Sequence, residues 1–268
     1  MTDQPGNEEA GTIPVGSGAE QREIAFRSCQ GEAPGLVWLG GYRSDMRGTK
    51  AEHLADLARR DGLGYCRFDY SGHGASGGRF EDGTISRWTE EAAAVLAATT
   101  RGRVILVASS MGAWIALRLV QRAAEFGLTG RIAGLLLLAP APDFTHRLML
   151  PRMTETQREA LDRDGLITEP SEYGPEPNVY TRALFEDGAA NLVMDGLIET
   201  GCPVTVIQGM ADPDVPFAHA LELVEHLPFH GVVVTLVRDG DHRLSRPQDL
   251  ALIERATKDL VADIRNSV

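Results

Sequence analysis

The chain has 268 residues, 43% of them hydrophobic, and a formal net charge of −12 at pH 7. The length allows one large domain or two small ones, and the apolar content suffices for a single core. The negative charge repels phosphate backbones, which argues against nucleic-acid binding. No apolar run reaches the length of about 18 residues that a membrane-spanning helix requires, so we expect no membrane span.

The N-terminal segment and the cysteines both bear on the compartment. Residues 1–21 have neither the basic start and apolar stretch of a secretory signal nor the Arg-rich composition of a transit peptide. We expect these residues to form a disordered tail. The cysteines Cys29, Cys66 and Cys202 are widely spaced and match no metal-binding pattern, so we expect reduced thiols in the core. These features predict a cytoplasmic protein.

Short apolar strands alternate with amphipathic helices along most of the chain. The predicted strands are residues 24–29, 36–39, 65–70, 104–108, 132–139, 203–208 and 232–237, and the predicted helices are residues 48–61, 84–99, 112–125, 216–227 and 247–265. This alternation is typical of an α/β fold with a mostly parallel central sheet and helices on both faces.

Residues 143–200 interrupt this alternation. They contain several Pro and Gly residues, no clear strand, and three weakly amphipathic segments near 154–163, 178–187 and 189–199. We therefore expect a small helical cap, inserted into an α/β core made of residues 22–142 and 201–268.

The strand at 104–108 leads directly into the segment Ala108-Ser109-Ser110-Met111-Gly112, after which a helix begins. A nucleophile elbow has this strand–turn–helix context, and its tight turn requires small residues two positions before and two after the serine. Ser110 has Ala108 and Gly112 at these positions, so the register favours Ser110 over Ser109. The start of the helix would also stabilise a developing anion there. The alternative is an ordinary turn that contains two serines.

An acid and a base follow in the chain order that this kind of site requires, which is Ser, then Asp or Glu, then His. Asp212 follows the strand at 203–208, and His242 follows the strand at 232–237. Both residues leave carboxyl ends of strands, at the same sheet edge as Ser110. We predict that His242 is the general base and that Asp212 orients it. Asp214 is the rival acid, and the loop pattern G-x-x-D-x-x-V-P favours Asp212.

Two glycine-rich segments remain. Gly40-Gly41-Tyr42 follows the strand at 36–39, and we expect the backbone N–H groups of Tyr42 and Met111 to form an oxyanion hole. Residues 72–77 match the dinucleotide-binding pattern G-x-G-x-x-G. No helix begins directly after them, so a pyrophosphate would lack its helix N-terminus, and we expect neither NAD nor FAD.

Several motifs resemble those of the α/β-hydrolases. Residues 41–51 are similar to the G-Y-x-S-x-M-x-G-x-K-A loop of the branch that contains the mitochondrial palmitoyl-protein thioesterase and mycophenolic acid acyl-glucuronide esterase. The same branch is resembled at Phe68–Gly78, Ser109–Gly112, Cys202-Pro203, Gly209–Asp212 and Asp241–Arg243. The resemblance covers about residues 35–260. It implies an α/β-hydrolase fold, Ser110, Asp212 and His242 as a catalytic triad, and hydrolysis of acyl esters or thioesters.

The chain departs from this branch at three points. From the composition of residues 1–21 we expect no mitochondrial presequence, Arg43 stands where the relative has an aliphatic residue, and the cap at 143–200 matches least. Gly41 and Arg43 are candidate substrate-binding residues because they lie next to the oxyanion loop. Arg43 could steer a carboxylate-bearing substrate, although a solvated surface arginine is the interpretation we favour.

These observations predict a serine hydrolase that cleaves small-molecule acyl esters or thioesters through an acyl-serine intermediate, without metal or organic cofactor. The alternatives are a peptidase, lactonase or C–C hydrolase with the same triad, or a non-catalytic small-molecule receptor. Some apolar cap residues could line an acyl pocket or merely pack the cap on the body: Phe144, Leu148, Met149, Leu150, Tyr180, Leu184 and Phe185. The sequence does not indicate an oligomeric state.

Overall fold

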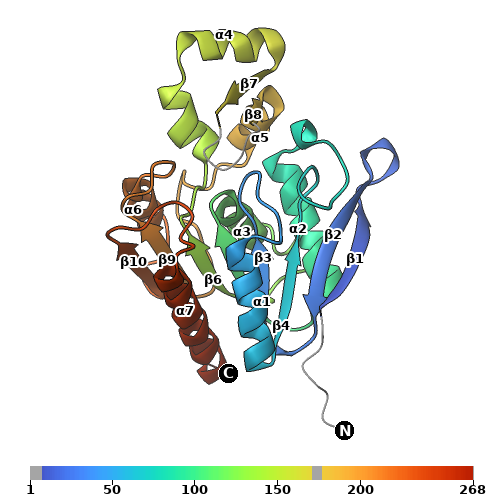
Figure 1. Ribbon diagram of the computed structural model, residues 1–268, viewed down its shortest axis with the longest axis vertical. Coiled ribbons are helices and arrows are strands. Elements are labelled where there is room, and N and C mark those ends of the chain that lie inside the picture. The colour runs from blue at the N-terminus through green and yellow to red at the C-terminus, as the bar shows by residue number, and fades with distance from the viewer. Residues whose placement is uncertain (1–7, 171–176, 268) are drawn as a thin grey trace.

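An eight-stranded sheet forms the centre of the computed structural model, which describes residues 8–170 and 177–267 (Figure 1). Its strands, in chain order, are β1 (Glu9–Val15), β2 (Arg22–Cys29), β3 (Glu32–Leu39), β4 (Leu63–Phe68), β5 (Val104–Ser109), β6 (Ile132–Leu138), β9 (Val204–Gly209) and β10 (Val232–Val237). Their spatial order is β1-β2-β4-β3-β5-β6-β9-β10. The strands from β4 to β10 pair in parallel, and β1 and β2 add an antiparallel edge.

Five helices cover the two faces of this sheet. They are α1 (Thr49–Asp61), α2 (Ile85–Thr99), α3 (Met111–Gln121), α6 (Phe217–Glu225) and α7 (Pro247–Asn266). Strand β5 is buried throughout, and its side chains alternate between two cores. Ile105 and Val107 belong to the core under α1 and α7, whereas Leu106 and Ala108 belong to the core under α2, α3 and α6. A continuous apolar run is what a strand covered on both faces requires, so the predicted doubly covered α/β sheet is confirmed.

The predicted disordered tail is wrong for the part of it that the structure describes. Residues 9–15 form β1, which pairs with β2 from Glu9↔Ser28 to Val15↔Arg22, and residues 18–20 form a short 3₁₀ turn. Glu8 also forms an ion pair with the buried Arg67 of β4. The segment has few apolar residues, and its order comes from pairing and charge contacts with distant strands, which local composition does not reveal. Residues 1–7 of the predicted tail lie outside the described residues.

The inserted segment lies above the carboxyl ends of the parallel strands (Figure 1). Its described elements are the short turns η3 (Thr145–Met149) and η4 (Leu150–Arg152), helices α4 (Glu155–Asp164) and α5 (Arg182–Ala190), and strands β7 (Leu166–Glu169) and β8 (Asn178–Thr181). The predicted helical cap does contain helices, α4 and α5, but it also contains strands that the sequence did not indicate, because β7 and β8 form a two-stranded antiparallel sheet. The predicted segment at 189–199 is mostly irregular. A four-residue strand is stabilised by its partner and leaves only a weak sequence pattern.

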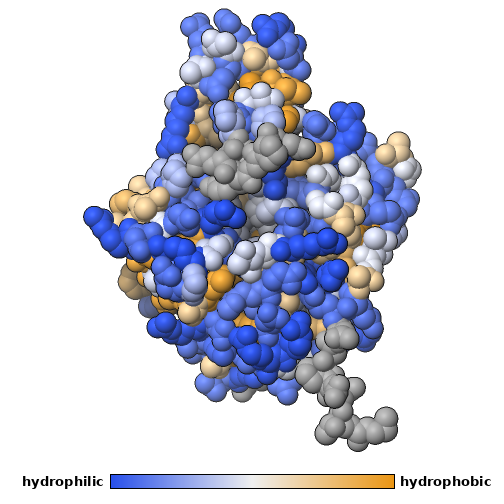
Figure 2. All heavy atoms as spheres, in the orientation of Figure 1, coloured by the Kyte–Doolittle hydropathy of each residue, from blue (hydrophilic) through white to orange (hydrophobic). Residues whose placement is uncertain are grey.

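Hydrophilic side chains cover most of the face shown in Figure 2, in keeping with the charged composition. Among the helices of residues 8–170 and 177–267, none combines the length and the apolar character needed to cross a membrane.

Candidate active site

Ser110 lies at the sharp turn between β5 and α3. Its φ of 54° and ψ of −119° place a non-glycine residue in a backbone region that side chains rarely adopt. The turn is held by hydrogen bonds, since Ser110 N donates to Leu138 O at 2.9 Å and Ala141 N donates to Ser110 O at 3.2 Å. Ser109, in contrast, is the last residue of β5 and is buried. The strained position is thus occupied by the serine that the register favoured.

Steric contacts explain why the residue two positions after Ser110 is the glycine Gly112. A Cβ on Gly112 would lie 2.3 Å from Leu39 O and 2.6 Å from Gly40 O, which no side chain tolerates. Gly112 thereby allows the first turn of α3 to contact the backbone that follows β3. Gly41 of the same loop lies directly beside the nucleophile candidate, since a Cβ there would be 3.2 Å from Ser110 Cβ.

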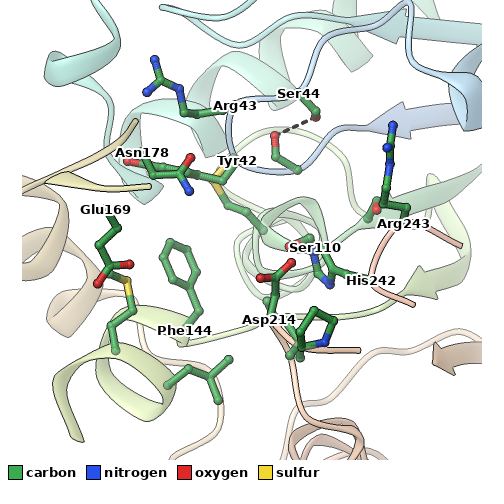
Figure 3. A pocket seen from close by; sticks show the side chains of 18 of the residues that line it. Tyr42, Arg43, Ser44, Ser110, Phe144, Glu169, Asn178, Asp214, His242 and Arg243 are labelled. Carbon is green, nitrogen blue, oxygen red and sulfur yellow. Dashed lines mark hydrogen bonds between the residues drawn. The ribbon is translucent and has the colours of Figure 1, made fainter. Parts of the chain in front are cut away.

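His242 and Asp212 complete a chain of hydrogen bonds that begins at Ser110 (Figure 3 labels Ser110 and His242). His242 Nε2 lies 3.1 Å from Ser110 Oγ, and His242 Nδ1 lies 2.8 Å from Asp212 Oδ2. The two side chains come from the loops after β10 and β9, which are parallel neighbours in the sheet. The structure therefore brings together three residues that are far apart in the sequence.

Asp212 is held by donors other than His242. Val215 N and Asp214 N donate to its Oδ1 at 2.8 and 2.9 Å, and Gln208 Nε2 donates to its Oδ2 at 3.1 Å. The carboxylate is thus fixed in orientation within the loop. The side chain of the rival Asp214 lines the adjoining cavity instead (Figure 3). The hydrogen bond to His242 belongs to Asp212, as the loop pattern predicted.

The loop that follows β3 contacts both Ser110 and the cap. The Tyr42 hydroxyl donates to Val179 O of β8, and its ring stacks on Tyr180 with centroids 5.1 Å apart and an interplanar angle of 11°. Burial raises the pKa of Tyr42 well above its ordinary value, so the phenol stays protonated and available as this donor. Met111 is the first residue of α3, at its positive end. The roles of the Tyr42 and Met111 N–H groups as oxyanion donors stay a prediction.

Arg43 is not the solvated surface residue that the sequence favoured. Its guanidinium lies over the ring of Phe80, with Cζ 4.8 Å from the centroid, and its Nη1 donates to Pro177 O of the cap. Its φ of 55° is again unusual for a non-glycine residue. These two partners lie 37 and 134 positions further along the chain, and a reading of the local sequence could not find them.

A cavity of about 730 Å³ opens beside Ser110 and His242. Of the apolar cap residues considered from the sequence, four line it, namely Phe144, Leu148, Met149 and Tyr180. Leu184 is instead buried in the core under α2, α3 and α6, and Phe185 is buried in a small apolar cluster within the cap. Leu150 is half-buried against that same cluster, which consists of Met153, Leu161, Ile167 and Phe185. Polar residues including Ser44, Lys50, Asp214 and Arg243 line another part of the cavity. The site therefore offers apolar and polar surfaces to one bound molecule.

The same residues could also be considered as metal ligands. Asp212, Asp214 and His242 each bring one ligand atom to within 4.8 Å of the others. Both ring nitrogens of His242 are already hydrogen-bonded, one to Asp212 and one to Ser110. A metal would have to displace one of these bonds, so the donor set fits a proton relay better than a metal centre.

Comparisons with known proteins agree with the α/β fold described above. Residues 33–253 match the model of the "Alpha/beta hydrolase family". The chain is 30% identical over 248 residues to "Palmitoyl-protein thioesterase ABHD10, mitochondrial" of Mus musculus, covering 91% of this chain and 80% of the relative.

Solved structures give the same picture. A "Putative hydrolase from Agrobacterium vitis S4" is 55% identical with a TM-score of 0.91, covering 95% of this chain and 99% of that one. "Alpha/beta hydrolase domain-containing protein 10 from mouse" is 25% identical with a TM-score of 0.84, covering 96% of this chain and 99% of that one.

Proposed function

The chain belongs to the alpha/beta hydrolase family, and from that premise we propose that it hydrolyses acyl thioesters or esters through a covalent acyl–Ser110 intermediate. One observation carries the proposal: the hydrogen-bonded series Ser110–His242–Asp212 at a strained strand–helix turn beside a partly apolar cavity. This series supplies a nucleophile, a base and a group that orients the base.

In the first half-reaction, Ser110 Oγ attacks the carbonyl carbon of the substrate while His242 Nε2 takes its proton. The carbonyl oxygen becomes an oxyanion, which the N–H groups of Tyr42 and Met111 stabilise. Collapse of the tetrahedral intermediate breaks the bond to the leaving sulfur or oxygen, and His242 returns the proton to that atom. Asp212 keeps the proton of the neutral imidazole on Nδ1 and stabilises the imidazolium that forms.

In the second half-reaction, His242 takes a proton from water, and the hydroxide attacks the acyl–Ser110 carbonyl. The second tetrahedral intermediate releases the acid, and Ser110 recovers its proton from His242. Both half-reactions use the same oxyanion donors. The enzyme therefore returns to its starting state without a cofactor.

The choice of an acyl ester or thioester rests on the relatives and the cavity. The mouse relative is named a palmitoyl-protein thioesterase. Phe144, Leu148, Met149 and Tyr180 provide an apolar wall for an acyl chain, and the cavity of about 730 Å³ lies in the range of small-molecule sites.

Three substrates with one acyl chain test the proposal: an S-acyl N-acetylcysteamine thioester, a p-nitrophenyl ester and a p-nitroanilide. We expect kcat/KM for the thioester or the ester to exceed about 10⁴ M⁻¹ s⁻¹, the lower end for typical enzymes, and to exceed that for the anilide. Preferred hydrolysis of the anilide would indicate a peptidase. No hydrolysis of the three substrates by the folded protein would favour a receptor.

Removal of divalent cations is expected to leave the hydrolysis rate unchanged. His242 uses both ring nitrogens within the protein, to Asp212 and to Ser110, so the relay needs no metal. The rate with the preferred substrate would be compared before and after dialysis against EDTA. A loss of activity that added Zn²⁺ or Mn²⁺ restores would contradict this expectation.

A further inference from the structure

The loop at residues 72–77, which resembled a dinucleotide-binding pattern, lies against the candidate oxyanion loop. It contains His73, a residue that is only 3% exposed. His73 Nε2 lies 3.2 Å from Arg43 N, and His73 Nδ1 lies 3.1 Å from Ser71 O. The imidazole thus connects the segment after β4 to the residue that follows Tyr42.

These two contacts fix the protonation of the ring. Ser71 O can only accept a hydrogen bond, so Nδ1 carries the proton and donates it. Arg43 N–H can only donate, so Nε2 must present its lone pair. Burial lowers the pKa of His73 to about 4, so the neutral ring that both contacts require persists near pH 7.

The surroundings of His73 hold the ring in one place. Its centroid lies 5.0 Å from that of Phe80, 5.4 Å from that of Trp88 and 5.8 Å from that of Tyr70. The following Gly74 has a φ of +46°, and a Cβ there would lie 2.1 Å from Asp69 Oδ2. The ring therefore has a rigid support.

A second contact joins the same two segments. Asp69 Oδ1 accepts a hydrogen bond from Met46 N at 2.6 Å, and Asp69 Oδ2 accepts one from Ala75 N at 2.8 Å. Residues 41–46 are thus attached to residues 69–77 at Arg43 and again at Met46. Of these two attachments, the one at Arg43 lies next to Tyr42.

Arg43 has a reason to need this support. Its φ of 55° is unfavourable for a residue with a side chain, so the local chain alone would not hold the turn. The bond from Arg43 N to His73 restrains the peptide that joins Tyr42 to Arg43. The adjoining peptide carries the Tyr42 N–H, whose direction decides how well it meets an oxyanion.

We propose that His73 is a positioning residue of the oxyanion hole, which holds the Tyr42–Arg43 peptide so that the Tyr42 N–H stays directed at the substrate carbonyl oxygen. This role rests on the proposed function. It also assigns the glycine-rich loop at 72–77 to support of the oxyanion loop rather than to a phosphate site.

The variants His73→Gln and His73→Asn test this role. A glutamine oxygen can reach the position of Nε2 and accept the Arg43 N–H, whereas the shorter asparagine can reach only the position of Nδ1. Both variants place an amide in the same buried position, which makes them a matched pair. The measurements are kcat and KM with an ester, and the Ki of a trifluoromethyl ketone with the same acyl chain. Ser110 Oγ adds to the carbonyl carbon of this ketone to form a hemiketal, and the former carbonyl oxygen then occupies the oxyanion hole.

Loss of a whole oxyanion donor costs about 10²- to 10³-fold in kcat, and a misdirected donor should cost less. We expect His73→Asn to lower kcat by about 10- to 100-fold with KM within about twofold, and to raise the Ki by a similar factor. His73→Gln should have a kcat and a Ki much closer to those of the wild type than His73→Asn has. Wild-type kcat in His73→Asn would overturn the role, and so would equal losses in both variants with an unchanged Ki. A wild type that neither hydrolyses esters nor binds the ketone would overturn the proposed function itself.

Discussion

Replacement of Ser110 by alanine is expected to lower kcat by about a million-fold, as removal of the nucleophile does in other serine hydrolases. The reason is that the Ser110 hydroxyl borders the cavity and its Oγ lies 3.1 Å from His242 Nε2, to which it can donate its proton. KM should change little, because the cavity wall stays in place. The measurement is steady-state hydrolysis of the preferred ester by the purified, folded variant.

Ser109→Ala is the matched control for this experiment. Ser109 precedes the nucleophile candidate in the chain, but it is the last residue of β5 and is buried. We expect its replacement to leave kcat within about tenfold of the wild type, in the range of small packing changes. The opposite result, with Ser109→Ala inactive and Ser110→Ala active, would contradict the assignment of the nucleophile.

The second large effect is expected for Asp212→Asn, which should lower kcat by about 10⁴-fold, as the corresponding change does in other triads. An asparagine can place an NH₂ group opposite His242 Nδ1, where Asp212 Oδ2 now accepts at 2.8 Å. The imidazole would then carry its proton on Nε2, facing Ser110, and could no longer act as a base. Asparagine has the same shape as aspartate, so the decrease in kcat reports the effect of the changed His242 tautomer rather than of altered packing.

Asp214→Asn is the control for Asp212→Asn. The side chain of Asp214 lines the cavity, whereas its backbone N–H already donates to Asp212. We expect this variant to change KM more than kcat, since its charge faces the bound molecule. A loss of kcat in Asp214→Asn as large as that in Asp212→Asn would mean that the two carboxylates share the role.

Much of the fold could be predicted because the parallel strands leave a clear apolar pattern in the sequence. Strands β5 and β6 are continuous apolar runs, since helices cover both of their faces. Strand β1 and the pair β7–β8 were missed because they are stabilised by partners rather than by their own composition. The resemblance to the palmitoyl-protein thioesterase branch is confirmed by the relatives. The cytoplasmic location stays a prediction, and the curated relative is named as mitochondrial.

The candidate site likewise contains residues that the sequence could predict and contacts that it could not. Ser110, Asp212 and His242 could be selected because each follows a predicted strand at the same sheet edge, in a fixed chain order. The contacts of the oxyanion loop could not be predicted from the sequence. Tyr42 bonds to Val179 across 137 positions in the chain, and His73 supports Arg43 across 30. These pairs depend on how the cap and two loops meet in space. The only sequence signal for His73 was a glycine-rich pattern that suggested a nucleotide.

The central claim is that Ser110 is an activated nucleophile, and the intact mass of the protein after incubation with a fluorophosphonate tests it most directly. The reagent phosphonylates a serine whose proton a neighbouring base removes, as His242 is positioned to do for Ser110. The account predicts one adduct on the wild type, one on Ser109→Ala and none on Ser110→Ala. A folded wild type without an adduct, or an adduct that persists in Ser110→Ala, would contradict it.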